Sequence, residues 1–351
     1  FPYTTLFRSL QAGTVLDGAG TFRFRDGTTT VGAGLSLSGK DLWVESGTVN
    51  GAGTITVRSG DAMRLTGGNF DGVGGLSILS GGMFTNNGGA TWGGRPVTNA
   101  GTFEATGRIN VSDNSALVFN NLAGGVVNLT GSGQFIAAAG NGQSAVLTNA
   151  VGGTITKSGT ADYELIYGAG TFVNHGTVEV NSGLLRASVT LPSGQLTEGT
   201  WRVADGARLV LNGDASITQN SATVVLTGAN SLFNGLNSLT NNSGSLSLLG
   251  GRAFTTGAAF TNSGTLVVGS GSAFSTSGAF TNTGTLSVIG TFAAGGGLTN
   301  LGTLAGAGAI TGSLTSGGTL APGNSPGLLT VSGNLTAGGG TGAGEGDVGQ
   351  P

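Results

Sequence analysis

A short phrase that recurs with a period of roughly 20 residues constrains the fold of this chain more than any other feature. The sequence reads FTNSGTLVV from Phe260, FTNTGTLSV from Phe280 and LTNLGTL from Leu298. A looser copy, LTNNSGSLSLL, begins one period earlier, at Leu239. One apolar–Thr–Asn–x–Gly–Thr–Leu phrase per period is typical of a solenoid, in which each repeat forms one coil stacked on the last.

The phrase predicts a corner between two short strands, because Asn and Gly tolerate the positive φ values of tight turns. After the corner, Leu266 and Val268 alternate with Thr265 and Val267, which places the first pair inward and the second toward solvent. Equivalent residues of successive copies then lie above one another, with Phe260, Phe280 and Leu298 inside and Asn262, Asn282 and Asn300 at the corner. We expect the stacked Asn side chains to hydrogen-bond from coil to coil, as they do in cross-β stacks.

More divergent copies of the phrase extend the pattern toward the N-terminus. We identify them as FTNNGG from Phe84, VTNAGTFEA from Val97, FNNLAGGVVNL from Phe119, LTNAVGGTIT from Leu147 and FVNHGTVEV from Phe172. Their starts are unevenly spaced, so we expect coils of unequal length with insertions at the corners. Residues 184–238 lack the phrase but keep the alternation, and their predicted inward positions are Trp201, Val203, Leu209, Leu211 and Val225.

Composition supports many short strands and argues against several other classes. Gly accounts for 72 of 351 residues without a G-X-Y period, so the chain is not collagen, and no stretch keeps a helical period over several turns. The net charge is −3 with only 13 Lys and Arg spread along the chain, which argues against nucleic-acid binding. The absence of Cys excludes disulfides and thiolate metal sites. The apolar runs are too short for a membrane-spanning helix, so we expect none.

We therefore predict an all-β fold, a single-stranded parallel β-helix (β-solenoid) with right-handed winding and coils of about 20–22 residues, over residues 10–336. Residues 1–9, FPYTTLFRS, resemble a translated sequencing adapter and are expected to be non-native, the alternative being an ordinary N-terminal strand. With no initiator Met or signal peptide ahead of the coils, we expect the start of the gene product to be missing. Residues 337–351 are expected to form a Gly-rich flexible tail or a truncated coil.

The stretch after the last copy of the phrase carries a resemblance to a known family. It continues as GAGAI, then GTLAPGNSPGLLTVSGN, and the chain here resembles the late passenger region of bacterial autotransporters and related large surface adhesins. The resemblance is strongest over residues 260–336 and weaker over most of the chain. The matching residues are Gly306, Gly308, Ile310, Gly318, Leu320, Pro322, Gly323, Asn324, Ser325, Pro326, Gly327, Val331, Gly333 and Asn334.

The resemblance implies a structural or adhesive segment of a secreted or surface-displayed bacterial protein, acting as a rigid stalk or binding surface. Because the sequence contains no recognisable catalytic cluster, we expect no catalysis, cofactor or metal. Its expected partners are a host, matrix or glycan ligand and an outer-membrane translocator barrel that lies outside this sequence. The expected location is extracellular or on the outer-membrane-associated cell surface. One alternative is a carbohydrate-active β-helix enzyme, either a polysaccharide lyase or a hydrolase. Another, which the Gly content and the adapter-like segment leave open, is a low-complexity open reading frame with no stable fold.

Two residues are candidates for nucleophilic catalysis. Ser325 lies in GNSPG, which matches the G-x-S-x-G elbow, but no helical pattern follows it as that elbow requires. The single His, His175, fills the variable position of the corner phrase, where Ser263, Thr283 and Leu301 stand in other copies. We therefore interpret GNSPG as a turn and expect His175 on the surface, and one His cannot form a His-based metal cluster.

Acidic and aromatic residues are candidates for carbohydrate chemistry. Asp162, Glu164 and Glu179 would approach one another if they lie on adjacent coils, and glycoside hydrolysis needs two carboxyl groups about 5 to 10 Å apart. We expect them to be solvated, like the charged segment that holds Arg202, Asp205 and Arg208. The recurring Thr261, Thr281 and Thr299 lack a second, paired Thr row, which argues against ice binding. The aromatic residues outside the Phe series are too scattered to form a sugar-binding stripe: Trp43, Trp92, Tyr163, Tyr167 and Trp201.

Overall fold

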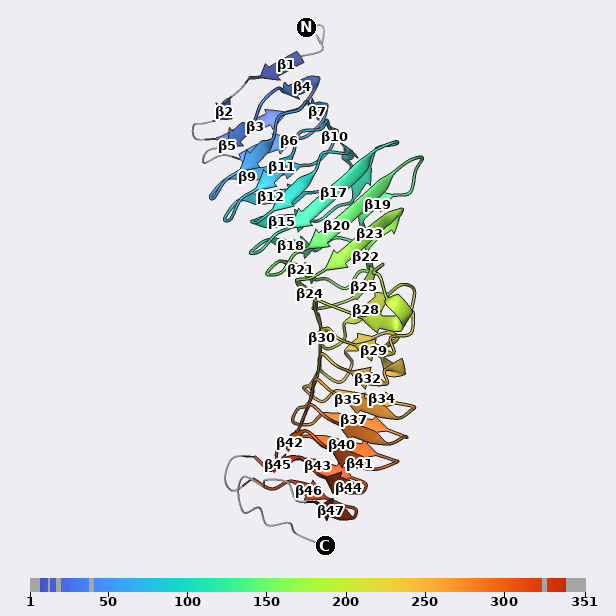
Figure 1. Cartoon of the computed structure of the whole chain (residues 1–351). Helices are drawn as coiled ribbons and strands as arrows, with labels where there is room; N and C mark the ends of the chain where they lie inside the picture. The colour runs from blue at the N-terminus through green and yellow to red at the C-terminus, as the bar shows by residue number, and fades with distance from the viewer. Residues whose placement is uncertain (1–6, 12, 17–19, 38–40, 324–326, 339–351) are drawn as a thin grey trace. The chain divides into compact units, whose positions relative to one another are not determined.

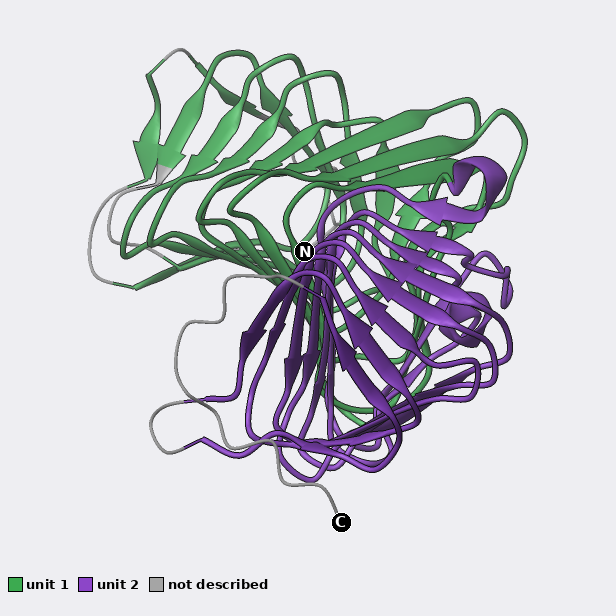
Figure 2. Cartoon of the chain, turned by 60° about the horizontal axis from the view of Figure 1, so that its bottom comes forward, with its two compact units in different colours: residues 1–190 green, residues 191–351 purple. Residues whose placement is uncertain are grey.

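The computed structural model describes residues 7–11, 13–16, 20–37, 41–323 and 327–338. The chain divides into two compact units, residues 1–190 and 191–351 (Figure 2). Both are built from short parallel strands stacked as a β-solenoid (Figure 1). Together they contain about 15 turns and almost no helix. The predicted all-β parallel solenoid is confirmed, and its right-handed winding stays a prediction.

Unit 1 has three sheets, and a typical turn contributes one strand to each. Sheet A comprises β1 (Phe7–Leu10), β4 (Thr28–Val31), β7 (Thr48–Asn50), β10 (Asn69–Asp71), β13 (Thr91–Gly93), β16 (Ile109–Val111), β19 (Gly133–Ala138), β22 (Tyr163–Gly168) and β25 (Leu184–Ala187). Sheet B comprises β2 (Val15–Leu16), β5 (Leu35–Leu37), β8 (Ile55–Val57), β11 (Leu76–Ile78), β14 (Val97–Asn99), β17 (Ala116–Asn121), β20 (Ser144–Asn149) and β23 (Gly170–Asn174). Sheet C comprises β3 (Thr21–Phe24), β6 (Asp41–Val44), β9 (Ala62–Leu65), β12 (Met83–Asn86), β15 (Thr102–Ala105), β18 (Val126–Leu129), β21 (Thr154–Lys157) and β24 (Thr177–Val180).

Unit 2 is organised in the same way. Sheet D comprises β26 (Gln195–Leu196), β29 (Gln219–Asn220), β32 (Asn241–Asn242), β35 (Phe260–Asn262), β38 (Phe280–Asn282), β41 (Leu298–Asn300), β44 (Leu314–Ser316) and β47 (Leu335–Ala337). Sheet E comprises β34 (Ala253–Thr256), β37 (Ala273–Thr276), β40 (Thr291–Ala294), β43 (Ala309–Thr311) and β46 (Thr330–Val331). Sheet F comprises β27 (Thr200–Val203), β30 (Thr223–Thr227), β33 (Ser245–Leu249), β36 (Thr265–Val268), β39 (Thr285–Val288), β42 (Thr303–Ala305) and β45 (Thr319–Ala321). The remaining elements are the paired strands β28 (Arg208–Leu211) and β31 (Leu232–Phe233) and the 3₁₀ turns η1 (Pro192–Gly194) and η2 (Leu236–Ser238).

Coil length varies more than the sequence predicts. Thr303 lies beside Thr319 in a short coil, whereas Val126 lies beside Thr154 in a much longer one. The long coil carries the extended strands β17 and β20, so additional residues lengthen strands as well as corners. A parallel ladder tolerates this variation, because pairing requires only that equivalent strands return to the same register.

The core of each unit is a column of inward side chains, as the alternation predicts. Leu266 and Val268 are fully buried, and Phe260 pairs in register with Phe280, which pairs with the next copy of the phrase. The rings of Phe260 and Phe280 stack with centroids 5.2 Å apart.

One inward assignment is wrong. Val225 faces outward beside Arg202, and Val224 is the fully buried residue. Because Val224 and Val225 are consecutive and identical, the inward–outward alternation fits with either one buried. The pairing of β30 with β27 decides that Val224 faces inward.

Buried Asn residues form a ladder along the axis of each unit, which confirms the prediction at the corner phrase. In unit 2 each Asn side chain donates to the next coil, with N–O distances of 2.7–3.0 Å, through Asn220, Asn242, Asn262, Asn282, Asn300 and finally Ser316. In unit 1 the same head-to-tail pattern has distances of 2.8 Å and runs through Asn99, Asn121, Asn149 and Asn174. Every one of these Asn side chains is at most 4% exposed. The ladder therefore satisfies polar groups that the solenoid interior would otherwise leave unpaired, except at its end in unit 1, where the Asn174 Nδ2 is buried without a partner in the described structure.

One of the predicted phrase copies is wrong. Phe84 of FTNNGG lies in β12 of sheet C, between Met63 and Phe103, whereas the ladder strands of this unit belong to sheet B. Asn86 donates to the carbonyl of Gly107 at 2.9 Å and is not a member of the ladder. The next copy begins too soon after Phe84 for the chain to complete a turn between them, so the two cannot be equivalent corners.

The recurring Gly of the corner has a different cause from the one predicted. Gly284 does not have a positive φ, and neither does Asn282. A Cβ atom at Gly284 would instead lie 2.1 Å from the carbonyl oxygen of Gly264 in the preceding coil. Gly is therefore required because stacked corners approach closely, not because the turn is left-handed.

The first and last described strands can be compared with the predicted limits of the solenoid, residues 10 and 336. Phe7–Leu10 forms β1 and pairs with Thr28–Val31 of β4, so the last residues of the adapter-like segment are part of the first strand. The non-native origin of residues 1–9 stays a prediction. Ala337 ends β47, and the predicted tail beyond residue 338 lies outside the described residues.

Candidate functional site

The two candidates for nucleophilic catalysis do not form a site in the described structure. His175 is exposed at the corner between β23 and β24, as predicted, and its backbone N–H donates to the carbonyl of Asn149 at 2.8 Å. Ser325 lies outside the described residues.

The acidic residues proposed for glycoside chemistry lie on different sheets. Glu164 is in β22 of sheet A, beside Gln134 and Arg186, whereas Glu179 is in β24 of sheet C. The third acid, Asp162, precedes β22. The structure therefore does not bring Glu164 and Glu179 together on one face.

Lys157 is a buried cation that the sequence analysis did not single out, and it interacts electrostatically with Asp162. The Lys157 Nζ donates to the carbonyl oxygens of Ser158, Gly159 and Ser182 at 2.7–3.3 Å. Burial lowers the pKa of Lys157, and the negative charge of Asp162 partly opposes this change. The Lys157 ammonium group is thus held by backbone carbonyl groups of the solenoid, so we do not assign it to ligand binding.

Most of the scattered aromatic residues are unavailable for stacking against a sugar. Trp92, Tyr163 and Trp201 are core residues at most 1% exposed, and burial raises the pKa of Tyr163. Tyr167 differs, because its side chain is 49% exposed. Trp43 lies on the outer face of sheet C, but arginines from two neighbouring coils lie over its ring.

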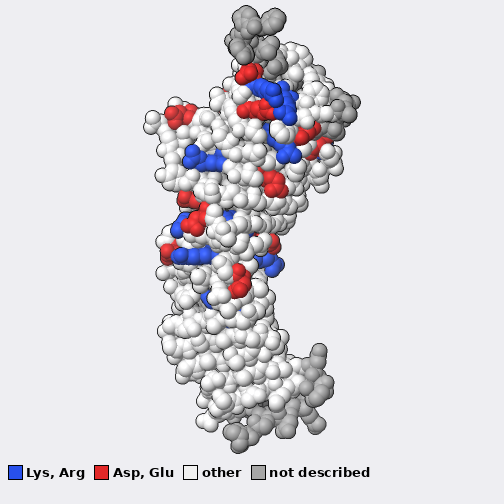
Figure 3. Space-filling view, turned by 180° about the vertical axis from the view of Figure 1, so that it is seen from behind, with Lys and Arg blue, Asp and Glu red and all other residues white. Residues whose placement is uncertain are grey.

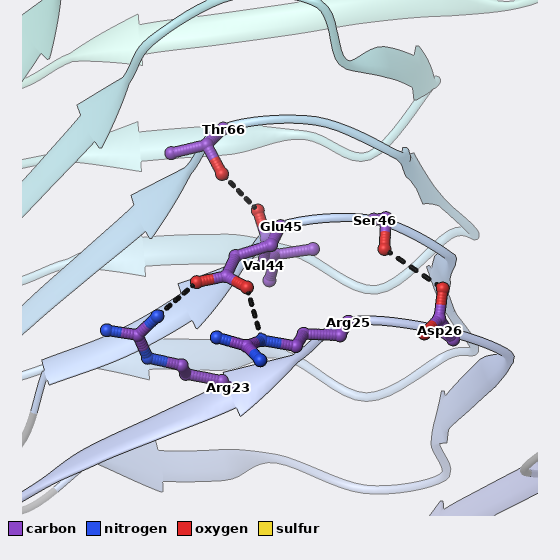
Figure 4. Close-up of polar contacts among 7 residues, drawn as sticks. All are labelled: Arg23, Arg25, Asp26, Val44, Glu45, Ser46 and Thr66. Atoms are coloured by element: carbon purple, nitrogen blue, oxygen red, sulfur yellow. Dashed lines mark hydrogen bonds and ion pairs between the residues drawn. The ribbon is translucent and has the colours of Figure 1, made fainter.

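A charged cluster surrounds Trp43 and comprises Arg23, Arg25, Asp41, Glu45 and Arg64. The guanidinium carbons of Arg23 and Arg64 lie 4.6 and 5.4 Å from the Trp43 ring centroid. Figure 4 shows both Arg23 and Arg25 pointing at the Glu45 carboxylate, with N–O distances of 2.8 and 2.7 Å. Arg23 and Arg64 are each paired with an acid and lie over the Trp43 ring from the coils on either side, so the cluster links neighbouring coils and competes with any ligand for the ring.

The recurring Thr residues form long outer rows. The row of Thr261, Thr281 and Thr299 continues in register through Thr315 and Thr336 on sheet D. A second row lies on sheet F and comprises Thr265, Thr285, Thr303 and Thr319. The corner phrase separates the two rows, so they occupy different sheets and do not form one flat double row of Thr.

The charged segment that holds Arg202, Asp205 and Arg208 runs from β27 to β28, and its last residue leads to a pocket. Arg202 and Asp205 are exposed, and Asp205 accepts a hydrogen bond from the backbone N–H of Asn230 at 2.8 Å. The Arg208 Nε donates to the Asn234 Oδ1 at 3.0 Å, and its Nη2 lies 3.7 Å from the Asp214 Oδ1. Arg208 thus orders two of the residues that line a pocket of about 420 Å³ in unit 2.

That pocket is the candidate site, and sequence reasoning missed it. Its walls come from the loop after β28, from β31 and η2, and from the residue before β34. The lining residues are Asp214, Ser216, Leu232, Phe233, Asn234, Gly235, Asn237, Ser238 and Arg252. The available signal was the turn-rich text LNGDAS followed by LFNGLNS, which interrupts the regular coils.

A fully buried cation, Arg95, was also not anticipated from the sequence. Its guanidinium donates to the carbonyl oxygens of Gly51, Gly53 and Asp71 at 2.8–3.3 Å, and its Cζ lies 4.9 Å from the Phe70 ring centroid. Burial lowers the pKa of Arg95 to about 10, with the Asp71 charge opposing this change, so the side chain is cationic at neutral pH. Arg95 acts as an internal clamp on the corners of preceding coils.

Within the described residues, no group of three or more His, Asp and Glu side chains is arranged to hold a metal ion. The described part of the chain likewise contains no helix with the length and apolarity to cross a membrane. Neither the models of known protein families nor the sequences of curated proteins give a match to this chain.

Proposed function

We propose that this chain is a structural and adhesive segment of a secreted or surface-displayed bacterial protein of the autotransporter type. The observation that carries the proposal is the ladder of buried Asn residues, which ties successive coils together in each unit. A segment that holds a binding surface away from a cell needs stiffness along its length. The proposed role is therefore mechanical support combined with binding, without catalysis.

The stiffness follows from three sets of contacts between neighbouring coils. Backbone ladders join each coil to the next along the sheets, and Phe side chains stack inside, as Phe274 and Phe292 do at 5.3 Å. An Asn side chain of the ladder donates a buried hydrogen bond to the Asn of the next coil, and its amide also donates to a backbone carbonyl of that coil, as Asn262 does to Asn282 and Thr285. Because each coil contacts mainly its neighbours, stability accumulates coil by coil, as in other solenoids.

The outer surface of unit 2 favours a binding role through hydroxyl and amide groups rather than charge. Residues 253–338 contain no Lys, Arg, Asp or Glu, and on the face drawn in Figure 3 the charged side chains gather away from this region. The Thr rows on sheets D and F present a regular array of hydroxyl groups there. Such a surface suits many weak hydrogen bonds to glycans or to extended polypeptides of a matrix.

The enzymatic alternative receives less support. A carbohydrate-active site needs two carboxyl groups facing one substrate. Glu164 and Glu179, the acids that the sequence suggested, project from different sheets.

Adhesion of the purified whole chain tests the proposal. Beads coated with the folded chain are passed over immobilised glycans and matrix proteins, with heat-unfolded chain as control, and the same preparation is incubated with polysaccharides. We expect saturable retention on at least one surface and no release of reducing or unsaturated sugar ends. Retention on none of the surfaces would contradict the adhesive role, and turnover of a polysaccharide would favour the enzyme.

A further inference from the structure

The pocket of unit 2 holds an arginine that has no acidic partner among the described residues. The Arg252 Nη1 donates to the carbonyl of Ala229 at 3.3 Å, while its Nε is buried without a hydrogen-bond partner. No carboxylate of the described chain lies within ion-pair distance of Arg252. Burial lowers the pKa of Arg252, which agrees with a guanidinium withdrawn from water.

The acidic residue of the same pocket, Asp214, already has polar partners within the protein. Asp214 accepts from the Asn234 side chain and lies 3.7 Å from the Arg208 Nη2. Asn212, Gly213 and Asp214 all have positive φ, and this turn places the Asp214 carboxylate against the side chain of Asn234, the residue that follows β31. The pocket therefore combines a compensated acid with an uncompensated cation.

The pocket exists because the solenoid changes sheets at this point. β31 is the last strand of its sheet and β34 is the first strand of sheet E, so no ladder joins these two coils along this face. The turn η2 fills part of the gap, and Gly235 approaches the loop so closely that a Cβ there would lie 2.1 Å from the Ala215 carbonyl oxygen. The backbone on both sides is thus held in place, which gives a preformed site.

We propose that this pocket binds the carboxylate of an acidic sugar residue, such as a uronate within a glycan chain. A guanidinium with free N–H groups pairs with a planar carboxylate through two parallel hydrogen bonds. The nearby Asp214 repels a dianionic phosphate more strongly than a singly charged carboxylate. This inference rests on the proposed adhesive function and names the class of ligand that the surface would recognise.

The remaining lining fits a ligand rich in hydroxyl groups. Ser216, Asn237 and Ser238 are exposed at the rim and offer both donors and acceptors. Leu232, which is 46% exposed, offers an apolar surface for the face of a sugar ring. The volume of about 420 Å³ lies within the range of small-molecule sites, about 300–1,000 Å³.

Calorimetric titration of the whole chain with a glucuronate trimer tests the inference, with the trimer methyl ester and a phosphorylated neutral trimer as comparison ligands. We expect the acid to bind at least tenfold more tightly than either, with affinity falling as salt is added. Arg252→Gln should weaken acid binding at least tenfold, whereas Arg58→Gln, which removes an equal charge in unit 1, should not. If Arg252→Gln alters the thermal melt, the rim variant Asn237→Ala with Ser238→Ala replaces it and should also weaken binding.

Equal binding of acid and ester, tighter binding of the phosphorylated trimer, an unaffected Arg252→Gln, or no binding at all would each overturn the inference. These outcomes are distinguishable from failure of the proposed function. If bead adhesion persists in Arg252→Gln, the chain is adhesive through another surface. If bead adhesion is absent while the trimer binds, the pocket is correct and the adhesive role is not.

Discussion

Replacing Asn282 with Ala should destabilise unit 2 by about 3 kcal/mol, since its three hydrogen bonds to neighbouring coils disappear and each contributes about 0.5–1.5 kcal/mol net. The Asn282 Nδ2 donates to the Asn300 Oδ1 at 2.8 Å and to the Thr303 carbonyl at 3.0 Å. Its Oδ1 accepts from the Asn262 Nδ2 at 2.8 Å. Asn282 is 0% exposed, so water cannot replace these partners without opening the corner.

Urea unfolding followed by circular dichroism gives the loss of stability, and hydrogen exchange by mass spectrometry locates it. Exchange should accelerate in peptides that cover β35, β38 and β41 and should change little in unit 1. Ser263→Ala is the matched control, because this exposed residue occupies the variable position of the corner one coil earlier. Asn282→Asp should cost more than Asn282→Ala at neutral pH, since it buries an unpaired charge. If the free energies of unfolding of Asn282→Ala and Ser263→Ala differ by less than about 0.5 kcal/mol, the Asn ladder does not stabilise the coils.

Four further predictions address other parts of the fold. Arg95→Met should lower the free energy of unfolding in urea by about 2–4 kcal/mol, because it leaves buried carbonyl oxygens without a donor, and Arg95→Lys should restore only part of this loss. Gly284→Ala should cost about 1–3 kcal/mol by overpacking the corner, and an unchanged midpoint would contradict the close approach. Val224→Ser should cost about 2 kcal/mol and Val225→Ser less than about 0.5 kcal/mol, and the reverse order would mean that the strand register is wrong. Burial raises the pKa of Asp71 above its usual 3.8, so the folded state holds this proton more tightly than the unfolded chain does. Its contribution to stability should therefore rise as pH falls through the raised pKa toward 3.8, and Asp71→Asn should remove this rise from urea midpoints measured between pH 7 and 4.

The regular coils could be predicted from local pattern alone. Residues 260–304 repeat an alternation of apolar and polar residues with an Asn at each corner, and this pattern has one arrangement that buries the apolar side chains and pairs the Asn residues. The structure confirms the stacking of Phe260 on Phe280 and the bond from Asn262 to Asn282. The ladder extends further than the phrase, to Asn220, because pairing needs only an Asn at the correct corner and not the whole phrase.

Other assignments were ambiguous in the sequence because they depend on which coil lies next to which. Val224 and Val225 are chemically identical, so only the pairing of β30 with β27 decides which one is buried. FTNNGG from Phe84 has the turn chemistry of the true copies, but coil length places it on another sheet. The role of Gly284 likewise depends on the carbonyl of Gly264 in the coil before it.

Local sequence is therefore enough to establish that this chain is a solenoid and, within its regular coils, which side chains face inward and which Asn residues form the ladder, since these properties repeat at short range. The positions of buried charge and of the pocket became visible only when the coils were stacked. Arg95 reaches carbonyl groups two coils earlier in the chain, at Gly53 and Gly51. Arg252 enters the same pocket as Asp214, far back in the sequence, because one sheet ends and another begins between them. Contacts over such separations depend on the summed lengths of the intervening coils, which vary along this chain and which no local pattern encodes.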